Sequence, residues 1–386
     1  MNYFLTRMLI LLGLAFSTSV LAQDNLDVQT TIDSTKLQSI KNISIRLPQD
    51  YYEKQTSHVS YPVLYFLDAG RADEYIHAEI STLSASGIIP DFIVVGIKRD
   101  GKNRYRDFTP VTNEENKGGG ADDFVHFIEH ELIPYIDNNY RTADFRILQG
   151  HSLGGLFSLH AFQAKPKLFQ AHFAFSPSLY WADSSVTQSV KKYVASANIK
   201  QSYLYANMGN EGLGLQRANG IAMREGFIEI SRLLQYTNKK SFRHNFELFE
   251  EDPHHLTQFT GMRRALRDLY KNWYLAPVVS LQGVTAFKAH FDRLSTQFGY
   301  KVTPQEGTIY WAGVANERMF GNRKTALPFF KLYVELYPNS VNALESLADF
   351  YKDDGDLEKA IPLINKALTL VSKTDDKYLS LFKKDL

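Results

Sequence analysis

The chain contains no cysteine among its 386 residues. Disulfide bonds, thiol catalysis and lipid attachment through cysteine are therefore excluded. It also lacks an excess of either charge, because 43 Lys and Arg residues balance 42 Asp and Glu residues and leave a net charge of +1. Such a balance argues against nucleic acid or another polyanion as the main partner. We expect no nucleic-acid partner.

Long apolar runs are missing after the first few residues, so the sequence predicts no membrane-spanning helix in the mature chain. The apolar stretch from Met8 to Leu21 follows Arg7 and ends in small or apolar residues before Gln23. A short stretch with this ending is typical of a secretory signal peptide, and a short amphipathic anchor is the alternative. We expect residues 1–22 to be removed, no stable membrane insertion after cleavage, and a secreted or periplasmic protein.

The most informative pattern is Gly150-His151-Ser152-Leu153-Gly154, which follows an apolar strand and runs directly into a helical pattern. Gly-x-Ser-x-Gly between a strand and a helix is the form of a nucleophile elbow, the sharp turn that exposes a reactive serine. Glycines two places before and after the serine remove side chains that would clash there. The pattern can arise by chance, but its strand and helix favour Ser152 as a nucleophile.

Strand and helix patterns alternate through most of the chain. Continuous apolar runs at Tyr61–Asp68 and Phe92–Ile97 are typical of strands buried on both faces. The alternation predicts an α/β-hydrolase fold for residues 23–276, with a mostly parallel twisted sheet and helices on both faces. The polar stretch from Lys98 to Gly120 is longer than most loops, which favours a functional loop.

From Pro277 the strand patterns stop and helical patterns take over. Two segments repeat at a spacing of 34 residues, marked by Ala326 and Ala360, as in a tetratricopeptide pair. We expect residues 277–386 to form a small all-α, tetratricopeptide-like domain. An ordinary helical hairpin packed on the first domain is the alternative.

A catalytic serine needs a base that takes its proton and an acid that holds this base in the right tautomer. In α/β-hydrolases the acid and then the histidine follow the serine, each in a loop after a later strand. Glu211 follows one predicted strand, although a solvated loop glutamate is the alternative reading. His254 and His255 follow the next strand. We favour His254 as the base and keep His255 as the alternative.

The oxyanion hole is expected to use the backbone N–H of Leu153, the residue after the nucleophile, and that of Ala69 in the turn after an earlier strand. A plain tight turn is the alternative at Ala69. Adjacent residues at an elbow point apart, so we expect His151 to pack or to line the pocket rather than to act as the base. Tyr180 and Trp181 are assigned to the same substrate pocket.

The run from Tyr61 to Tyr270 resembles the putative-esterase family of α/β-hydrolases, which is related to esterase D and to the ferric-siderophore esterases. The segments that carry this resemblance are Pro62–Asp68, Ile93–Ile97, Arg106–Pro110, Glu131–Ile136, Gly150–Phe157 and Ser176–Trp181. The resemblance implies a serine carboxylic-ester hydrolase with Ser152, Glu211 and His254 in the triad positions and no metal or organic cofactor. Two residues depart from the family pattern, since His255 and Ala69 stand where glycine is common.

We therefore expect an exported carboxylic-ester hydrolase that acts through an acyl-serine on a small-molecule siderophore, aryl or acyl ester. The alternative is a catalytically inactive hydrolase-fold binding protein that recruits a protein or peptide partner through its helical tail. Intact candidates for all three triad positions favour the enzyme.

Overall fold

The structure, a computed structural model, describes residues 26–70, 72–196, 202–211, 218–236 and 242–371. The predicted signal peptide, residues 1–22, lies outside these ranges. The chain forms two compact units, Met1–Gln49 with Tyr61–Lys271 and Asp50–Ser60 with Asn272–Leu386. The limits expected from the sequence, 23–276 and 277–386, differ from this division by the stretch Asp50–Ser60 and by residues 272–276.

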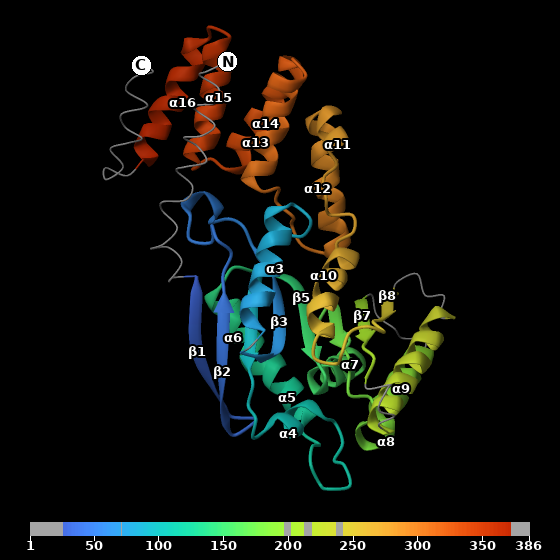
Figure 1. Cartoon of the computed structure of the whole chain (residues 1–386). Coiled ribbons are helices and arrows are strands. Elements are labelled where there is room, and N and C mark those ends of the chain that lie inside the picture. Colours follow the sequence, from blue (N-terminus) through green and yellow to red (C-terminus); the bar gives the residue numbers. More distant parts are fainter. Residues whose placement is uncertain (1–25, 71, 197–201, 212–217, 237–241, 372–386) are drawn as a thin grey trace. The chain divides into compact units, whose positions relative to one another are not determined.

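The first unit is built on an eight-stranded sheet of order β1-β2-β4-β3-β5-β6-β7-β8 (Figure 1). The strands are β1 (Asp27–Ser34), β2 (Ser39–Arg46), β3 (Tyr61–Ala69), β4 (Ile93–Lys98), β5 (Thr142–His151), β6 (Ala171–Phe175), β7 (Ser202–Met208) and β8 (Phe242–Leu248). β2 is antiparallel to both β1 and β4, and every pair from β4 to β8 is parallel. The predicted α/β fold with a mostly parallel sheet is confirmed.

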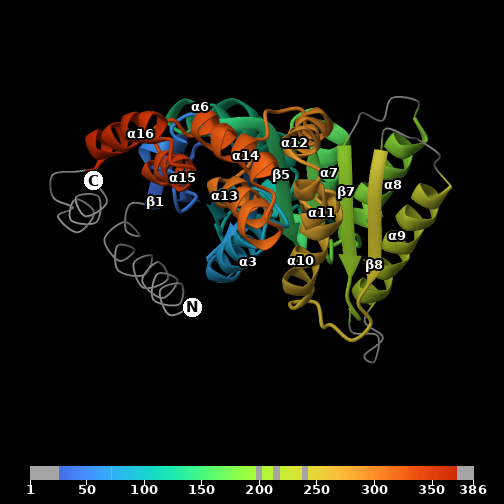
Figure 2. The same ribbon diagram turned by 90° about the horizontal axis from the view of Figure 1, so that it is seen from above.

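Helices cover both faces of this sheet (Figures 1 and 2). The helices are α3 (Asp73–Ala85), α4 (Arg104–Phe108), α5 (Ala121–Phe127), η3 (Ile128–Leu132), α6 (Ile133–Asn139), α7 (Leu153–Ala164), α8 (Trp181–Ala195), α9 (Ala218–Gln235) and α10 (Thr257–Leu269). α3 and α10 pack on each other over one face, while α7 packs on β5 and β6 and against α5 and α8 over the other. α7 is buried from Leu153 to Phe162, as expected of a helix that is apolar on all sides.

The direction in which the sheet grows reverses at β3, because β4 lies on one side of it and β5 on the other. In open α/β sheets, ligands bind outside the carboxyl ends of the strands at such a switch point. Ala69 is the last residue of β3 and His151 the last of β5. The topology therefore places the predicted nucleophile turn beside the predicted oxyanion turn.

The second unit is helical. Its elements are η2 (Lys54–Thr56), α11 (Pro277–Leu281), α12 (Val284–Phe298), α13 (Glu306–Val314), η5 (Ala315–Met319), α14 (Arg323–Leu336), α15 (Val341–Asp353) and α16 (Leu357–Leu370). α14 packs on α13 and α15, and α15 packs on α16. Ala326 and Ala360 are both fully buried, each as the fourth residue of its helix. That these helices are tetratricopeptide repeats stays a prediction.

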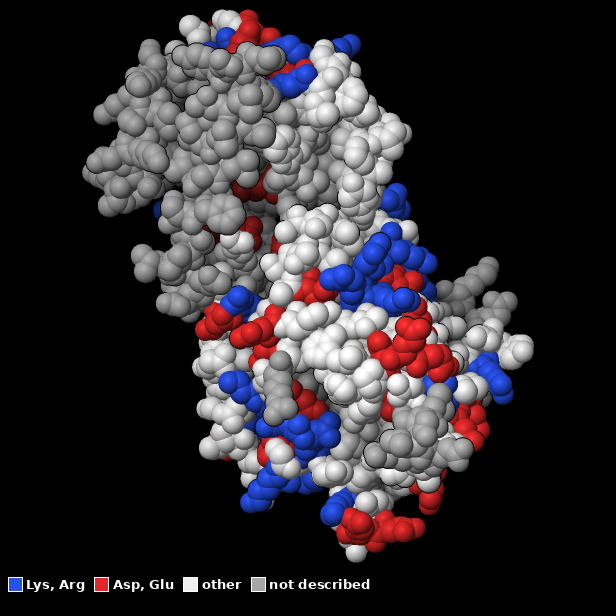
Figure 3. Space-filling view, in the orientation of Figure 1, with Lys and Arg blue, Asp and Glu red and all other residues white. Residues whose placement is uncertain are grey.

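Charge is mixed on the surface of the first unit, where basic and acidic side chains are interspersed on the face shown in Figure 3. Within the described part of the chain, no helix has the length and apolar character needed to cross a bilayer.

Candidate active site

The turn at Ser152 is a strained one. Ser152 joins β5 to α7 with φ 61° and ψ −119°, a region that residues with side chains rarely occupy. A Cβ atom on Gly150 would lie 2.1 Å from the carbonyl oxygen of Gly154, so only glycine fits at position 150. A Cβ on Gly154 would approach nothing closer than 3.4 Å, whereas one on Gly155 would lie 2.9 Å from the Phe175 carbonyl oxygen. The second crowded glycine is therefore Gly155.

Glu211 and His254 are brought together by adjacent parallel strands, since Glu211 follows β7 and His254 follows β8. His254 Nδ1 lies 2.7 Å from Glu211 Oε2. The side chain of Glu211 is 3% exposed and that of His254 is 36% exposed, while His255 lies exposed on the surface. Because the carboxylate accepts this bond, Nδ1 carries the proton and Nε2 is the nitrogen able to take another.

Hydroxyl and amide groups surround the Glu211 carboxylate. Glu211 Oε1 accepts a hydrogen bond from the Gly209 N–H at 3.2 Å, and the buried Ser176 Oγ accepts from Gly209 N–H at 3.1 Å and from Thr257 Oγ1 at 3.0 Å. Burial alone would raise the pKa of the Glu211 carboxyl, but the hydrogen bond and charge of His254, with hydrogen bonds from Ser176 and Gly209, hold it below its usual range. The carboxyl is therefore ionised at neutral pH.

His151 contacts the histidine loop rather than the serine beside it. Its Nε2 lies 2.7 Å from the carbonyl oxygen of His254, and the two rings are 4.7 Å apart. Burial, followed by the neighbouring His254, lowers the pKa of His151 to about 4, so its ring is neutral at pH 7. A carbonyl oxygen only accepts hydrogen bonds, so His151 Nε2 donates. The sequence predicted that His151 packs or lines the pocket, but it did not predict this hydrogen bond to the His254 backbone.

The two predicted oxyanion donors lie at the ends of neighbouring strands, since Ala69 ends β3 and Leu153 follows β5 by two residues. Leu153 is the first residue of α7, where backbone N–H groups have no partner within the helix. Ala69 ends β3 after Asp68, which has a positive φ of 58° at a shift in the strand register. Arg104 from α4 binds the Asp68 carboxylate through Nε and Nη2 at 2.7 to 2.9 Å. This fork fixes the turn beside Ala69.

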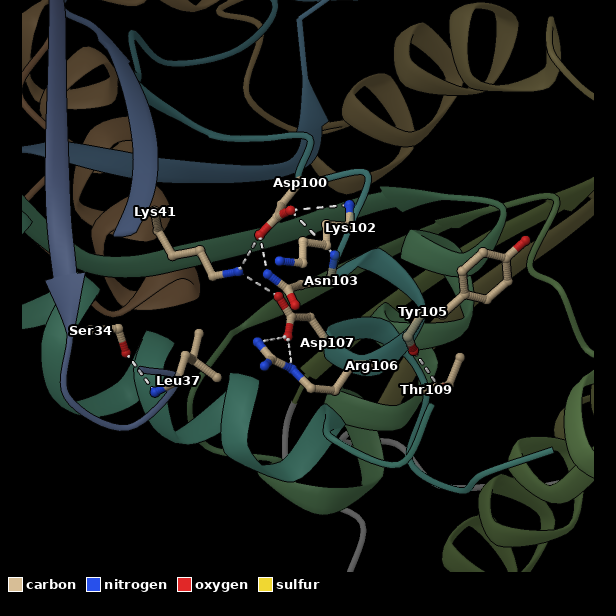
Figure 4. A network of polar contacts seen from close by, with 10 residues as sticks. All are labelled: Ser34, Leu37, Lys41, Asp100, Lys102, Asn103, Tyr105, Arg106, Asp107 and Thr109. Atoms are coloured by element: carbon tan, nitrogen blue, oxygen red, sulfur yellow. Dashed lines mark hydrogen bonds and ion pairs between the residues drawn. The ribbon is translucent and has the colours of Figure 1, made fainter. Parts of the chain in front are cut away.

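The stretch from Lys98 to Gly120, expected to be a loop, contains the short helix α4. Lys41 of β2 is 2% exposed and lies 2.6 Å from Asp107 and 3.1 Å from Asp100 (Figure 4). Arg106 also donates to Asp107, at 2.9 Å. A buried ammonium group needs such partners to offset its loss of hydration. The ion pair with Asp107 attaches α4, and with it Arg104, to β2.

Of the aromatic residues predicted for the pocket, Tyr180 is half-buried and Trp181 is buried. Trp181 Nε1 donates to the Val111 carbonyl oxygen at 2.8 Å, and its ring lies 5.5 Å from that of Tyr105. Both contacts come from the stretch that contains α4. In the described ranges, no group of three or more His, Cys, Asp and Glu side chains is arranged to hold a metal ion.

Comparison with known proteins gives consistent results. The family described as "Putative esterase" matches residues 34–264. The ferri-bacillibactin esterase BesA of Bacillus subtilis is 30% identical over 190 residues, which cover 41% of this chain and 65% of BesA. The siderophore triacetylfusarinine C esterase of Aspergillus fumigatus is 30% identical over 168 residues, covering 41% of this chain and 58% of that protein. The chain thus spans less than two thirds of the length of these relatives.

Solved structures share the fold. An IroE-like serine hydrolase from Shewanella oneidensis has a TM-score of 0.65 at 24% identity, covering 89% of this chain and 100% of that one. The BES protein from Bacillus cereus has a TM-score of 0.54 at 27% identity, covering 63% of this chain and 94% of that one.

Proposed function

The chain belongs to the putative-esterase family, and on this premise we propose that it is a serine carboxylic-ester hydrolase acting through an acyl-serine intermediate. The observation that supports this most is the 2.7 Å contact between Glu211 and His254 at the same sheet edge as the strained Ser152. An acid that orients a histidine at the strand ends where a half-buried serine also lies is an arrangement that can activate the serine hydroxyl for attack.

In the proposed reaction, Ser152 Oγ attacks the ester carbonyl carbon while His254 Nε2 takes its proton. The electron pair of the C=O bond moves to the carbonyl oxygen, which the N–H groups of Leu153 and Ala69 stabilise. The charged His254 ring is stabilised by Glu211 and then gives its proton to the departing alcohol. Water repeats the sequence on the acyl-serine, with His254 again acting first as base and then as acid.

Siderophore or other aryl and acyl esters are the proposed substrates. The two curated relatives are named for action on siderophores, which motivates this class. The Arg104 guanidinium and the rings of Tyr105 and Tyr180 lie on segments that follow the carboxyl ends of β4 and β6, where a substrate would bind. A planar cation and aromatic rings suit an aromatic or oxygen-rich ester. Export after removal of residues 1–22 is part of the same proposal.

Hydrolysis of p-nitrophenyl acetate and of a panel of siderophore, feruloyl and acyl esters by the purified protein tests the function. Ser152→Ala and His254→Ala should each lower kcat by about 10⁴-fold or more, because nucleophile and base act as a unit. His255→Ala is the matched control and should keep wild-type kcat, since His255 is exposed. A crippled His255→Ala with an active His254→Ala would reassign the base, and full activity in Ser152→Ala would refute the function.

A further inference from the structure

A second serine contacts the nucleophile. Ser178 Oγ lies 3.2 Å from Ser152 Oγ, and the backbone N–H of Ser178 donates to the Ser152 carbonyl oxygen at 3.1 Å. Ser178 follows β6 and is only 2% exposed. Because both its side chain and its backbone contact Ser152, the position of its hydroxyl is coupled to that of the nucleophile.

We propose that Ser178 is a further catalytic residue, whose hydroxyl donates a hydrogen bond to Ser152 Oγ and stabilises the negative charge that this oxygen carries as its proton leaves. This inference rests on the proposed esterase function. It assigns Ser178 a role toward the nucleophile rather than toward the substrate.

Either hydroxyl could be the donor in the structure, and the proposed reaction sets the direction of the hydrogen bond. Each has one proton to donate and two lone pairs that accept. When Ser152 donates its proton to His254 Nε2, its oxygen can only accept from Ser178. The proton of Ser178 must then point at Ser152 Oγ. Ser178 is buried, so this bond is made in surroundings where water competes little and an electrostatic contact is stronger than in bulk solvent.

The bond is strongest where charge on Ser152 Oγ is greatest. During attack, the Ser152 proton passes to His254 while the bond from Oγ to the carbonyl carbon is still forming. During release of the acid product, that bond breaks, Oγ regains charge and His254 returns the proton. The proton of Ser178 stays on Ser178 throughout. An interaction that is stronger in the transition state than in the ground state raises kcat.

Ser178→Ala removes the hydroxyl and keeps the backbone bond to Ser152, so the segment after β6 retains one of its ties to the elbow. Ser178→Thr keeps the hydroxyl. Ser158→Ala is the matched control, because Ser158 is fully buried on α7 and its hydroxyl donates to the Leu148 carbonyl oxygen, at 3.4 Å, rather than to Ser152.

Two rates are measured for each variant: kcat/KM for p-nitrophenyl acetate, and the second-order rate of inactivation by a fluorophosphonate, which also requires attack by Ser152. Removing one preorganised donor to a developing oxyanion costs about 10²- to 10³-fold, and the charge on Ser152 Oγ is smaller, so we expect Ser178→Ala to slow both rates by about 10- to 100-fold. Ser178→Thr should recover most of this loss, and Ser158→Ala should match wild type.

Wild-type rates in Ser178→Ala would overturn the inference. So would slow ester turnover combined with full-speed inactivation, since the hydroxyl would then act on the substrate. If circular dichroism shows that Ser178→Ala does not fold, the test passes to Ser178→Thr, which keeps the hydroxyl. A folded Ser178→Thr with both rates lowered would then overturn the inference. A wild-type protein that neither hydrolyses the ester nor reacts with the fluorophosphonate would contradict the esterase function itself.

Discussion

Replacing Glu211 by Gln keeps the size of the side chain and removes its charge. The buried carboxylate accepts from His254 Nδ1 at 2.7 Å and from the Gly209 N–H at 3.2 Å, whereas an amide offers one oxygen and one NH₂ group. If the amide oxygen faces Gly209, the NH₂ faces Nδ1 and the ring must carry its proton on Nε2. In that tautomer His254 cannot take the proton of Ser152. If the amide is flipped, the NH₂ meets the Gly209 N–H and two donors face each other.

The size of the loss follows from these two orientations. A buried donor left without an acceptor costs about 1–3 kcal/mol, which lowers the population of the flipped, active orientation by about 5- to 150-fold. The charged His254 ring also loses a carboxylate partner, and a hydrogen bond to a charged group contributes about 1–2 kcal/mol more than a neutral one. Together these terms lower kcat by about 10²- to 10³-fold, less than loss of the serine.

The assay is kcat for p-nitrophenyl acetate, with circular dichroism to show that the variant is folded. Glu251→Gln is the matched control, because Glu251 is an exposed glutamate in the loop that precedes His254, and its kcat should equal that of wild type. Near-normal kcat in Glu211→Gln would show that the 2.7 Å contact does not set the tautomer of His254.

Three further substitutions test the surrounding structure. Gly150→Ala would place a methyl group 2.1 Å from a backbone oxygen and should displace the elbow, which lowers kcat about 10²-fold or more. Gly101→Ala, whose methyl group would have nothing within 4 Å, should keep wild-type kcat, and an active Gly150→Ala would contradict the elbow geometry. Burial lowers the pKa of His172 to about 3, so the stability that comes from its neutral ring is fully present above its unfolded pKa of 6.5 and is lost as the pH falls toward 3. In urea unfolding, the wild-type protein should therefore lose about 2 kcal/mol more unfolding free energy between pH 7.5 and pH 5 than His172→Phe does. An equal loss in the two proteins would refute this cause. Lys41→Met removes the ammonium partner of the buried Asp107, which keeps Arg106, and should cost about 1–3 kcal/mol in urea unfolding. Lys41→Met with Asp107→Leu should recover most of this loss, and a single variant as stable as wild type would show that the ion pair does not stabilise the fold.

Much of the first unit could be predicted from the sequence because its central strands are buried on both faces. The apolar runs at Tyr61–Asp68 and Phe92–Ile97 became β3 and β4. The elbow lies at Ser152 as predicted, but the second crowded glycine is Gly155 and the expectation for Gly154 was wrong. α4 was missed because five residues give no helical period. The stretch Asp50–Ser60 groups with the helical unit through tertiary contacts, for which the sequence has no local signal.

The part of the site that could be predicted is the part that depends on the order of residues along the chain. The order of serine, acid and histidine singled out Glu211 and His254, and their strands bring them into contact. Ser176, Ser178 and Thr257 were missed as functional groups, although the Ser-Pro-Ser run directly after a buried strand is a visible signal. Isolated hydroxyl residues are typical of loops in a sequence, and only burial and the convergence of strand ends show what they contact.

The most direct test of the esterase proposal is peptide mapping by mass spectrometry after reaction of the full-length protein with a fluorophosphonate. An activated serine attacks phosphorus at a useful rate, whereas an ordinary hydroxyl does not. We expect one adduct, on Ser152, and no adduct in the Ser152→Ala variant. An adduct on another residue, or ester hydrolysis that continues at the wild-type rate in a protein whose Ser152 carries the adduct, would contradict the assignment of Ser152 as the nucleophile.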